Sequence, residues 1–408
     1  MTCRHCQSPV NLAFLDLGSA PPSNAYLTPE GLSGPEAWYP LRVNVCESCW
    51  LVQTEDFTRA EALFDATYAY FSAMSTSWLK HCERMVAESV GRFGLGAESR
   101  VVEIAANDGY LLQYVKERGI PCLGVEPTHS AAEVARGRGI EVVEEFFGRR
   151  LGAELAEQGW SADLMVANNV LAHVPEINDF VGGFASLLKP DGVASFEFPH
   201  LLRLVEGHQF DTVYHEHFSY LSLTAVKTIF ATNGLDVFDV EELPTHGGSL
   251  RVFAQRSDSG KHDTSPEVTR VLDEEESAGV STPAFYEGFQ DKAEAVKYGF
   301  LRFLLEARER GERVAAYGAA AKGNTLLNFA GVKADLIEYV VDRSPAKQGN
   351  FLPGSRIPIV GESRLQQDPP DHVLILPWNL KDEVMAQLAD LAGRGTRFVT
   401  AVPKLTIH

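Results

Sequence analysis

The stretch "VVEIAANDGYLL", residues 101–112, reads as a buried strand, a tight turn and the start of a helix. The apolar run ends in Glu103, and the turn carries Asn107, Asp108 and Gly109. A helix that starts after such a turn directs its free backbone N–H groups at polar groups of a ligand. The stretch therefore predicts the ligand-binding strand–turn–helix unit of an open α/β sheet.

The neighbouring segments extend this unit into a whole sheet. Strand and helix patterns alternate from "PCLGVEPT" (121–128) to "GVASFEFP" (192–199). Repeated βα units indicate a parallel sheet that is covered by helices on both faces. Two later strand patterns, at 235–243 and 249–256, predict an antiparallel hairpin at one edge.

The turn favours S-adenosylmethionine (SAM) over a dinucleotide. Ala105 and Asn107 stand where G-x-G-x-x-G glycines would admit a pyrophosphate. SAM has no pyrophosphate, and its ammonium and sulfonium groups favour nearby acids such as Glu103 and Asp108. Glu126 ends the second strand, where a carboxylate can accept hydrogen bonds from ribose hydroxyls. The predicted plan is therefore a class I SAM methyltransferase domain, which is Rossmann-like.

Other predicted cofactor contacts lie at later strand ends and upstream. Phe146 is expected to end the third strand and pack on the adenine, and Asn168 ends the fourth. Tyr68 and Tyr70 precede the domain, in a segment that could cover the cofactor. The predicted SAM-binding residues are Tyr68, Tyr70, Glu103, Asn107, Asp108, Gly109, Glu126, Phe146 and Asn168.

Four cysteines near the N-terminus form two C-x-x-C pairs, "CRHC" and "CESC". Cys3, Cys6, Cys46 and Cys49 predict a tetrahedral zinc site, because each pair places two thiolates on one side of the metal. Two disulfides are the alternative, which a reducing cytoplasm disfavours. Four sulfur ligands leave no open position, so the zinc is expected to be structural.

Size and charge restrict the class of protein. A chain of 408 residues suggests two or three domains. The formal charge of −19 argues against a nucleic-acid partner. No apolar run is long enough to cross a membrane, and the N-terminus lacks a signal-peptide pattern. We expect a cytoplasmic enzyme with a small-molecule substrate, and a monomer by default.

The chain divides into three predicted domains of α/β class. A small zinc-binding module occupies residues 1–70, the SAM-dependent methyltransferase domain 71–258, and a Rossmann-like α/β domain 259–408. The polar, acidic segment at 257–277 predicts a linker or a solvated helix face.

The segment "YHEHFSYL", residues 214–221, follows the fifth strand of the predicted sheet. Ligands bind at the carboxyl ends of such strands, so Tyr214, Glu216 and His217 are expected there beside His173. A metal site and a structural cluster are two possible interpretations. We favour proton transfer, because a neutral imidazole near pH 7 is an effective base. Methylation at carbon needs such a base to form an enolate.

Together with "YAYFS", "HGGSLRV", "YGAAAKGNTLLN" and "VVDRSPAKQGNFLPGSRIPI", these motifs resemble those of SAM-dependent sugar C-methyltransferases, which build branched deoxysugars of antibiotics. The chain is most similar in pattern to dTDP-sugar C-3'-methyltransferases. The resemblance implies a dTDP-linked 4-keto-6-deoxy sugar that is methylated at C3. It implies that His217 removes the C3 proton, and that Tyr214, helped by Glu216 and His173, stabilises the enolate. Configuration inverts if base and methyl donor lie on opposite faces of the ring.

The resemblance also places the nucleotide sugar on the C-terminal domain. "YGAAAKGN" is a strand-to-helix turn in which Lys322 could meet a diphosphate, although it is not a P-loop. His246 and Arg251 are expected to complete a basic pocket, while Lys347 contacts the nucleotide or is merely solvated. The predicted substrate-binding residues are His246, Arg251, Gly318, Lys322, Asn324 and Lys347.

Two other functions stay open at this point. One is a SAM-dependent O- or N-methyltransferase, in which the histidine cluster deprotonates an alcohol or amine. The other is a zinc-dependent binding module with a degenerate SAM fold, against which Glu103, Asp108 and Glu126 speak. The sequence leaves open which sugar and which nucleotide carrier are used.

Overall fold

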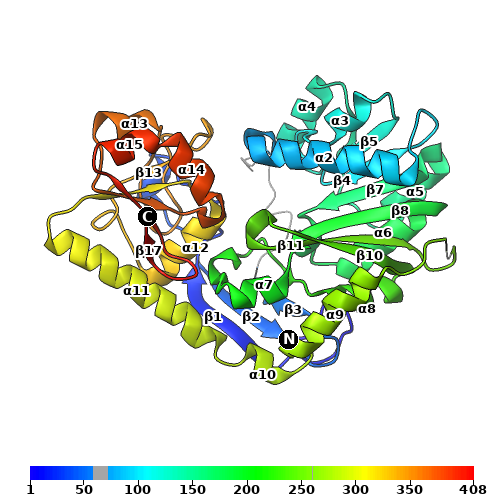
Figure 1. Ribbon diagram of the computed structural model, residues 1–408, viewed down its shortest axis with the longest axis horizontal. Helices are drawn as coiled ribbons and strands as arrows, with labels where there is room; N and C mark the ends of the chain where they lie inside the picture. The colour runs from blue at the N-terminus through cyan, green and yellow to red at the C-terminus, as the bar shows by residue number, and fades with distance from the viewer. Residues whose placement is uncertain (58–71, 260) are drawn as a thin grey trace.

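The computed structural model describes residues 1–57, 72–259 and 261–408. The strands in these ranges form three β-sheets, of four, seven and six strands. In Figure 1 the seven-stranded sheet lies on the right, the six-stranded sheet on the left, and strands β1 to β3 at the bottom between them. The predicted cofactor residues Tyr68 and Tyr70 lie outside the described residues.

The four-stranded sheet joins distant parts of the chain. Strands β1 (Leu12–Ala20), β2 (Tyr39–Val45) and β3 (Val52–Thr54) are antiparallel neighbours near the N-terminus. The fourth strand, β9 (Ser219–Tyr220), belongs to the histidine-rich segment and pairs with β3. The predicted domain boundaries stay predictions. The four-stranded sheet crosses one of them, because β9 lies in the predicted range 71–258 and pairs with β3 of the range 1–70.

The seven-stranded sheet has the predicted parallel arrangement with an antiparallel hairpin. The order is β10-β11-β8-β7-β4-β5-β6, and β8 to β6 run parallel. The hairpin of β10 and β11 is antiparallel to β8. The strands are β4 (Val101–Ile104), β5 (Cys122–Val125), β6 (Glu141–Val143), β7 (Ala162–Asn168), β8 (Leu188–Pro199), β10 (Leu235–Leu243) and β11 (Ser249–Arg256).

Helices cover both faces of this sheet, as alternating βα units require. One apolar core packs α2 (Thr76–Phe93), α3 (Leu112–Lys116) and α4 (His129–Gly137) against one face. A second core packs α5 (Arg149–Leu155), α6 (Ile177–Leu187) and α8 (Leu223–Thr232) against the other. Helix α7 (Leu201–Glu206) follows β8 and leads toward the histidine-rich segment. The predicted α/β class is confirmed.

The polar segment after β11 is a helix rather than a linker. Helix α9 (Pro266–Ala278) begins with a proline at its first position and ends at Gly279, whose φ of 86° is left-handed. Val268, Val271 and Glu275 are buried. The linker interpretation is therefore wrong for this helix. Its many charged residues made the segment look fully solvated, although one face of the helix packs inward.

The six-stranded sheet is the predicted second α/β unit. Its order is β14-β13-β12-β15-β16-β17, with only the last pair antiparallel. The strands are β12 (Val314–Tyr317), β13 (Val340–Val341), β14 (Ile359–Val360), β15 (His372–Ile375), β16 (Arg397–Thr400) and β17 (Thr406–Ile407). The helices are α12 (Ala321–Ala330), α13 (Ser363–Gln367), α14 (Lys381–Gln387) and α15 (Ala389–Gly393).

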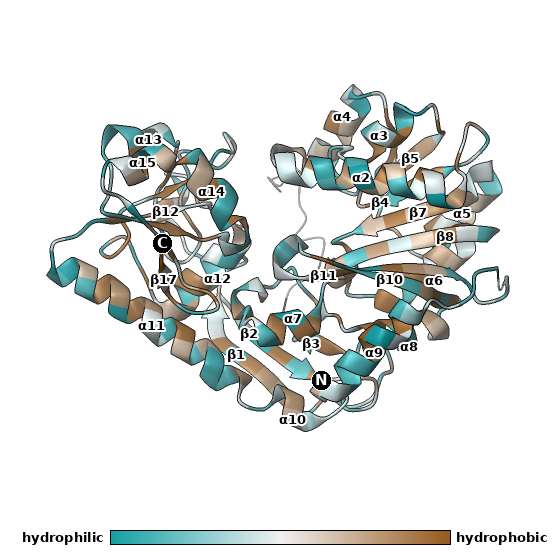
Figure 2. Cartoon of the chain, viewed as in Figure 1, coloured by the Kyte–Doolittle hydropathy of each residue, from teal (hydrophilic) through white to brown (hydrophobic). Residues whose placement is uncertain are grey.

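Helices α10 (Pro283–Tyr286) and α11 (Phe289–Glu309) connect the N-terminal strands to the six-stranded sheet. Figure 2 shows apolar and polar patches alternating along α11, as expected for a helix with one buried face. Phe14 of β1 stacks on Phe289, with ring centroids 4.6 Å apart. No helix within the described ranges is both long and apolar enough to cross a bilayer.

Candidate active site

The histidine-rich segment is held in place by its backbone from two sides. The Thr54 hydroxyl in β3 donates to the His217 carbonyl at 3.0 Å, and Phe218 N donates to the Ala172 carbonyl at 2.8 Å. Ala172 lies in the turn η4 (Leu171–His173) that follows β7. The segment therefore lies between the N-terminal sheet and the carboxyl end of the central sheet.

The two histidines of the segment have different surroundings. His215 bonds the Pro40 carbonyl through Nε2 at 3.2 Å, and its ring contacts Tyr39. His217 bonds the Thr212 carbonyl through Nδ1 at 2.9 Å. His215 therefore belongs to the packing of the N-terminal sheet, and His217 faces the carboxyl ends of the central strands.

The hydrogen bond of His217 determines its tautomer. A carbonyl oxygen only accepts, so Nδ1 carries the hydrogen and Nε2 keeps its lone pair. Nε2 makes no hydrogen bond to any described residue. Burial lowers the pKa of His217 well below its ordinary value, and the charges of His173, His246 and Lys322 lower it further. The His217 imidazole is thus neutral at neutral pH.

Tyr214 and His173 surround the His217 ring. The ring centroids of Tyr214 and His217 are 3.9 Å apart, and those of His173 and His217 are 4.6 Å apart. His173 Nδ1 bonds the Glu216 carbonyl at 2.7 Å, and burial lowers the pKa of His173 to about 4. The structure brings these predicted catalytic residues together, while their roles stay predictions.

The Glu216 side chain points to the N-terminal part of the chain. Its Oε1 accepts hydrogen bonds from Asn24 N at 3.3 Å and Asn24 Nδ2 at 3.1 Å. Oε2 is buried and bonds no described residue, and burial raises the pKa of the carboxyl. Asn24 carries no motif, and the sequence interpretation did not identify it.

The turn after β4 has the strained backbone that a ligand-binding turn needs. Ala105, Asn107 and Gly109 have positive φ values of 57°, 48° and 76°. A Cβ on Gly109 would lie 2.4 Å from Ile140 Cδ1, so only glycine fits. Glu126 stabilises the turn, because its two oxygens accept from Asn107 N at 2.9 Å and Thr128 N at 2.8 Å.

Buried polar atoms at these strand ends fit a polar cofactor. Among the described residues, neither side-chain atom of Asn168 and neither oxygen of Glu103 has a hydrogen-bond partner, and Asp108 Oδ1 also has none. Asp108 Oδ2 accepts from Ala73 N at 3.3 Å and lies 3.5 Å from Arg138 Nη2. Burial raises the pKa of Glu103 and of Asp108. These donors and acceptors suit the ammonium, carboxylate and ribose of SAM.

Phe146 does not end a strand. β6 ends at Val143, and Phe146 lies three residues later with 49% of its surface exposed. The prediction was wrong on this point because the apolar "FF" pair continues a strand-like pattern into a loop. An exposed aromatic ring still suits contact with an adenine.

The predicted substrate side contains a partly buried lysine. Lys322 Nζ donates to Asn379 Oδ1 at 2.7 Å and lies 4.6 Å from the Trp378 ring centroid. Burial lowers the pKa of Lys322. Trp378 Nε1 in turn donates to Asp211 Oδ2 at 2.7 Å. Asp211 and Trp378 were missed from the sequence, because neither belongs to a recognisable motif.

His246 and Arg251 have different environments. His246 has a positive φ of 54°, and its buried Nδ1 bonds no described residue. Burial and, to a smaller extent, the charge of Lys322 lower the pKa of His246 to about 4. The Arg251 guanidinium bonds Glu197 at 2.8 Å and Glu241 at 3.2 Å, so its charge is paired within the protein.

The turn before α12 is closely packed. Gly318 has a φ of 87°, and a Cβ there would lie 2.6 Å from Pro377. Asn324 Nδ2 donates to the Ser23 carbonyl at 2.7 Å. Lys347 Nζ donates to the Ala319 carbonyl at 2.8 Å. Asn324 and Lys347 thus make contacts within the protein beside this turn.

The four N-terminal cysteines form one cluster. Their Sγ atoms all lie within 4.8 Å of one another, and the Cys3–Cys49 and Cys6–Cys46 pairs are 3.5 Å apart. A disulfide needs about 2.05 Å, so the disulfide alternative does not hold. Four sulfurs at these separations fit one tetrahedral zinc ion with Zn–S bonds of about 2.3 Å.

Comparisons with known proteins cover nearly the whole chain. Family models match a zinc binding domain at residues 3–64, a methyltransferase domain at 78–240 and a C-methyltransferase C-terminal domain at 244–403. The C-methyltransferase NovU of Streptomyces niveus is 35% identical over 402 residues, which are 98% of this chain and 95% of that protein.

Two similar solved structures each match part of the chain. Magnesium protoporphyrin IX methyltransferase from Synechocystis PCC 6803 with bound SAM is 17% identical and has a TM-score of 0.34, covering 44% of this chain and 79% of its own. A SAM-dependent methyltransferase from Anabaena variabilis ATCC 29413 is 13% identical and has a TM-score of 0.38. The match covers 49% of this chain and 96% of that protein.

Proposed function

The chain belongs to the family of SAM-dependent C-methyltransferases, and from this premise we propose that it methylates C3 of a nucleotide-linked 4-keto-6-deoxy sugar through an enolate. The observation that carries the proposal is the hydrogen bond between His217 Nδ1 and the Thr212 carbonyl. It leaves Nε2 as the basic nitrogen of a buried, neutral imidazole.

The chemistry of carbon methylation explains the surrounding side chains. A C–H beside a ketone becomes acidic enough to remove when a base is positioned and donors stabilise the enolate oxygen. His217 takes the C3 proton on Nε2. Tyr214, whose ring lies against His217, is the nearest hydroxyl-bearing candidate for the oxyanion donor. His173 is the second candidate, with its ring 4.6 Å from that of His217.

The residues at the strand ends would hold the methyl donor. Asp108, Glu126, Asn168 and the turn around Gly109 present the polar atoms that a SAM site needs. SAM supplies an electrophilic methyl group on its sulfonium. If this methyl approaches the ring face opposite to His217, C3 inverts its configuration.

A partly buried cation supports an anionic, nucleotide-linked substrate. Lys322 is the second residue of α12, which follows the turn at Gly318, and its charge acts on His217 and on His246. A diphosphate at this helix N-terminus would bring its sugar toward the imidazole. The dTDP carrier follows from the family resemblance and belongs to the proposal.

Hydrogen exchange at C3 tests the proposal. The enzyme is incubated in D2O with dTDP-4-keto-6-deoxyglucose and S-adenosylhomocysteine, so that no methyl transfer occurs. We expect deuterium at C3, detected by NMR, and a loss of at least about 100-fold in the exchange rate for His217→Asn. His215→Asn is the matched control, because His215 packs in the N-terminal sheet and should leave exchange unchanged.

One result would count against this function, and another would count only against the role of His217. Methylation of oxygen or nitrogen without C3 exchange in the wild type would favour the O- or N-methyltransferase alternative. Exchange that persists undiminished in His217→Asn would remove His217 as the base, while leaving the carbon-acid reaction intact.

A further inference from the structure

Trp378 joins the six-stranded sheet to the segment that leads to His217. It lies in the turn η7 (Trp378–Leu380), shortly after β15. Its indole Nε1 donates to Asp211 Oδ2 at 2.7 Å. Asp211 belongs to the turn η5 (Phe210–Thr212), which lies just before the histidine-rich segment. This hydrogen bond is one of several between the C-terminal α/β unit and the rest of the chain, and the bond of the Thr325 hydroxyl to the Val213 carbonyl at 2.8 Å is another close to η5.

Neighbouring groups fix the indole ring on several sides. Lys322 Nζ lies 4.6 Å from the Trp378 ring centroid, within the range of a cation–π contact. Gly247, with a φ of 90°, approaches so closely that a Cβ there would lie 2.5 Å from the ring. The ring therefore has one position, and its N–H one direction.

The same turn fixes the tautomer of His217. Thr212 follows Asp211 directly, and its carbonyl accepts the hydrogen of His217 Nδ1. The Thr212 hydroxyl and N–H both point to the Gln209 carbonyl, at 2.7 and 3.0 Å. A shift of η5 would move the carbonyl that holds the imidazole.

We propose that Trp378 and Asp211 are positioning residues for His217. The indole N–H holds the Asp211 carboxylate, Asp211 holds η5, and the Thr212 carbonyl then selects the Nδ1–H tautomer. The base role of His217 rests on the proposed function, but the effect on its tautomer does not. The C-terminal domain thereby controls the geometry of a residue that lies beside the carboxyl ends of the seven-stranded sheet.

Matched substitutions separate positioning from folding. Trp378→Phe keeps an aromatic ring beside Lys322 and removes the N–H together with part of the indole ring. We expect kcat and the C3 exchange rate to fall about 10-fold, which corresponds to one lost hydrogen bond, with KM little changed. Asp211→Asn keeps an acceptor for the indole and should retain the wild-type rate within about twofold, whereas Asp211→Ala should match Trp378→Phe. Trp38→Phe is the control, because Trp38 is exposed elsewhere on the surface.

A double-substitution cycle adds a check that misfolding does not imitate. If the two residues act through one contact, the double variant Trp378→Phe/Asp211→Ala should lose no more of kcat than either single variant loses. A fold-loss in kcat of the double variant that equals the product of the two single fold-losses would overturn the proposal.

An NMR signature distinguishes this inference from the proposed function. Two-bond 1H–15N spectra of 15N-histidine protein report the tautomer, and His217→Asn assigns the signal. We expect Nδ1–H for His217 in the wild type and a mixture with Nε2–H in Trp378→Phe. An unchanged tautomer with unchanged kcat overturns the inference. A tautomer change in an enzyme that shows no C3 exchange supports the inference and removes the proposed function instead.

Discussion

At the scale of single residues, the environment of His217 predicts an unusual pH profile. Burial, His173, His246 and Lys322 all lower its pKa, so the imidazole stays neutral as the pH falls through about 6.5. We expect kcat/KM for methylation to stay flat from about pH 8 to about pH 6 and to fall only at lower pH. Initial rates across this range measure the effect.

Asp211 titrates close to the same range and must be separated from His217. Burial raises the pKa of Asp211 to about 6, against the opposing charge of Lys322. If the fall of kcat/KM at low pH disappears in Asp211→Asn, that fall reports the titration of Asp211. A limb centred near pH 6.5 that remains in this variant would contradict a buried, neutral His217.

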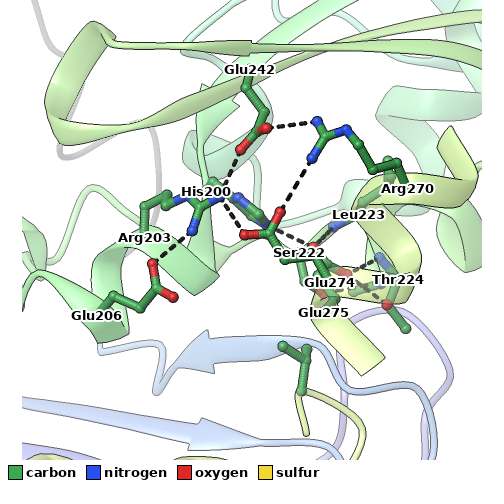
Figure 3. A network of polar contacts seen from close by, with 12 residues as sticks. His200, Arg203, Glu206, Ser222, Leu223, Thr224, Glu242, Arg270, Glu274 and Glu275 are labelled. Carbon is green, nitrogen blue, oxygen red and sulfur yellow. Dashed lines mark hydrogen bonds and ion pairs between the residues drawn. The ribbon is translucent and has the colours of Figure 1, made fainter. Parts of the chain in front are cut away.

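At the scale of elements, helix α9 is attached to the central domain through one buried carboxylate. Glu275 Oε1 accepts from His200 Nε2 at 2.7 Å and Leu223 N at 2.6 Å, and Oε2 accepts from Thr224 N at 2.8 Å (Figure 3). Leu223 and Thr224 begin helix α8, whose first N–H groups need acceptors. Glu275 therefore caps α8 from another helix.

Removing this carboxylate should destabilise the fold. Glu275→Ala leaves His200 and the α8 N–H groups unpaired in the interior, so we expect a loss of about 3–5 kcal/mol in the free energy of unfolding. Glu276→Ala, on the exposed side of α9, should change it by less than about 0.5 kcal/mol. Urea unfolding followed by circular dichroism compares the two. Equal stability of both variants would show that the cap contributes nothing.

The pH dependence of this cap has a defined sign. Burial raises the pKa of Glu275, but the hydrogen bond and charge of His200 outweigh it and leave the pKa below its ordinary value. The contribution of Glu275 is therefore present above about pH 4.5 and is lost as the pH falls through the lowered pKa. The ion pairs of Arg203 and Arg270 in Figure 3 are more exposed and should contribute less.

At the scale of the whole molecule, the three sheets are not independent. One apolar core contains Phe14 of β1, Phe210 of η5 and Phe300 of α11. Strand β9 of the histidine-rich segment is the edge strand of the N-terminal sheet. The geometry of the candidate base therefore depends on a sheet that the cysteine cluster supports.

Loss of the metal should thus affect catalysis from a distance. We expect Cys46→Ser, or removal of the ion by a chelator, to lower C3 exchange by more than about 10-fold, because disorder around β3 releases β9. SAM affinity should change less, since the described residues predicted to bind SAM lie at the strand ends of the seven-stranded sheet. Zinc content by mass spectrometry, exchange by NMR and SAM binding by calorimetry measure the three quantities.

The control for this experiment is Cys122→Ser, since Cys122 is free and lies outside the cluster. This variant should keep the wild-type zinc content, C3 exchange rate and SAM affinity. A metal-free protein with full C3 exchange would show that the N-terminal sheet holds the segment without zinc.

The sequence by itself determined the elements with a local signal. Alternating strand and helix periods predicted the seven-stranded and six-stranded sheets, because side-chain periodicity reflects burial within each element. The doubled C-x-x-C spacing predicted the cysteine cluster, because each C-x-x-C pair already places two thiolates on one side of a metal ion. Phe146 was misjudged because the apolar run continues past the end of β6, whereas for helix α9 the sequence left a linker and a solvated helix face open and only the linker was wrong.

Only the tertiary structure decided the contacts that unite these elements. The pairing of β9 with β3, the bond between Trp378 and Asp211, and the Glu275 cap each join residues far apart in the chain. Such contacts leave no periodic pattern, because each depends on where two independently formed elements come to lie. The same reason explains why His215 and His217, two positions apart in one segment, face different parts of the molecule.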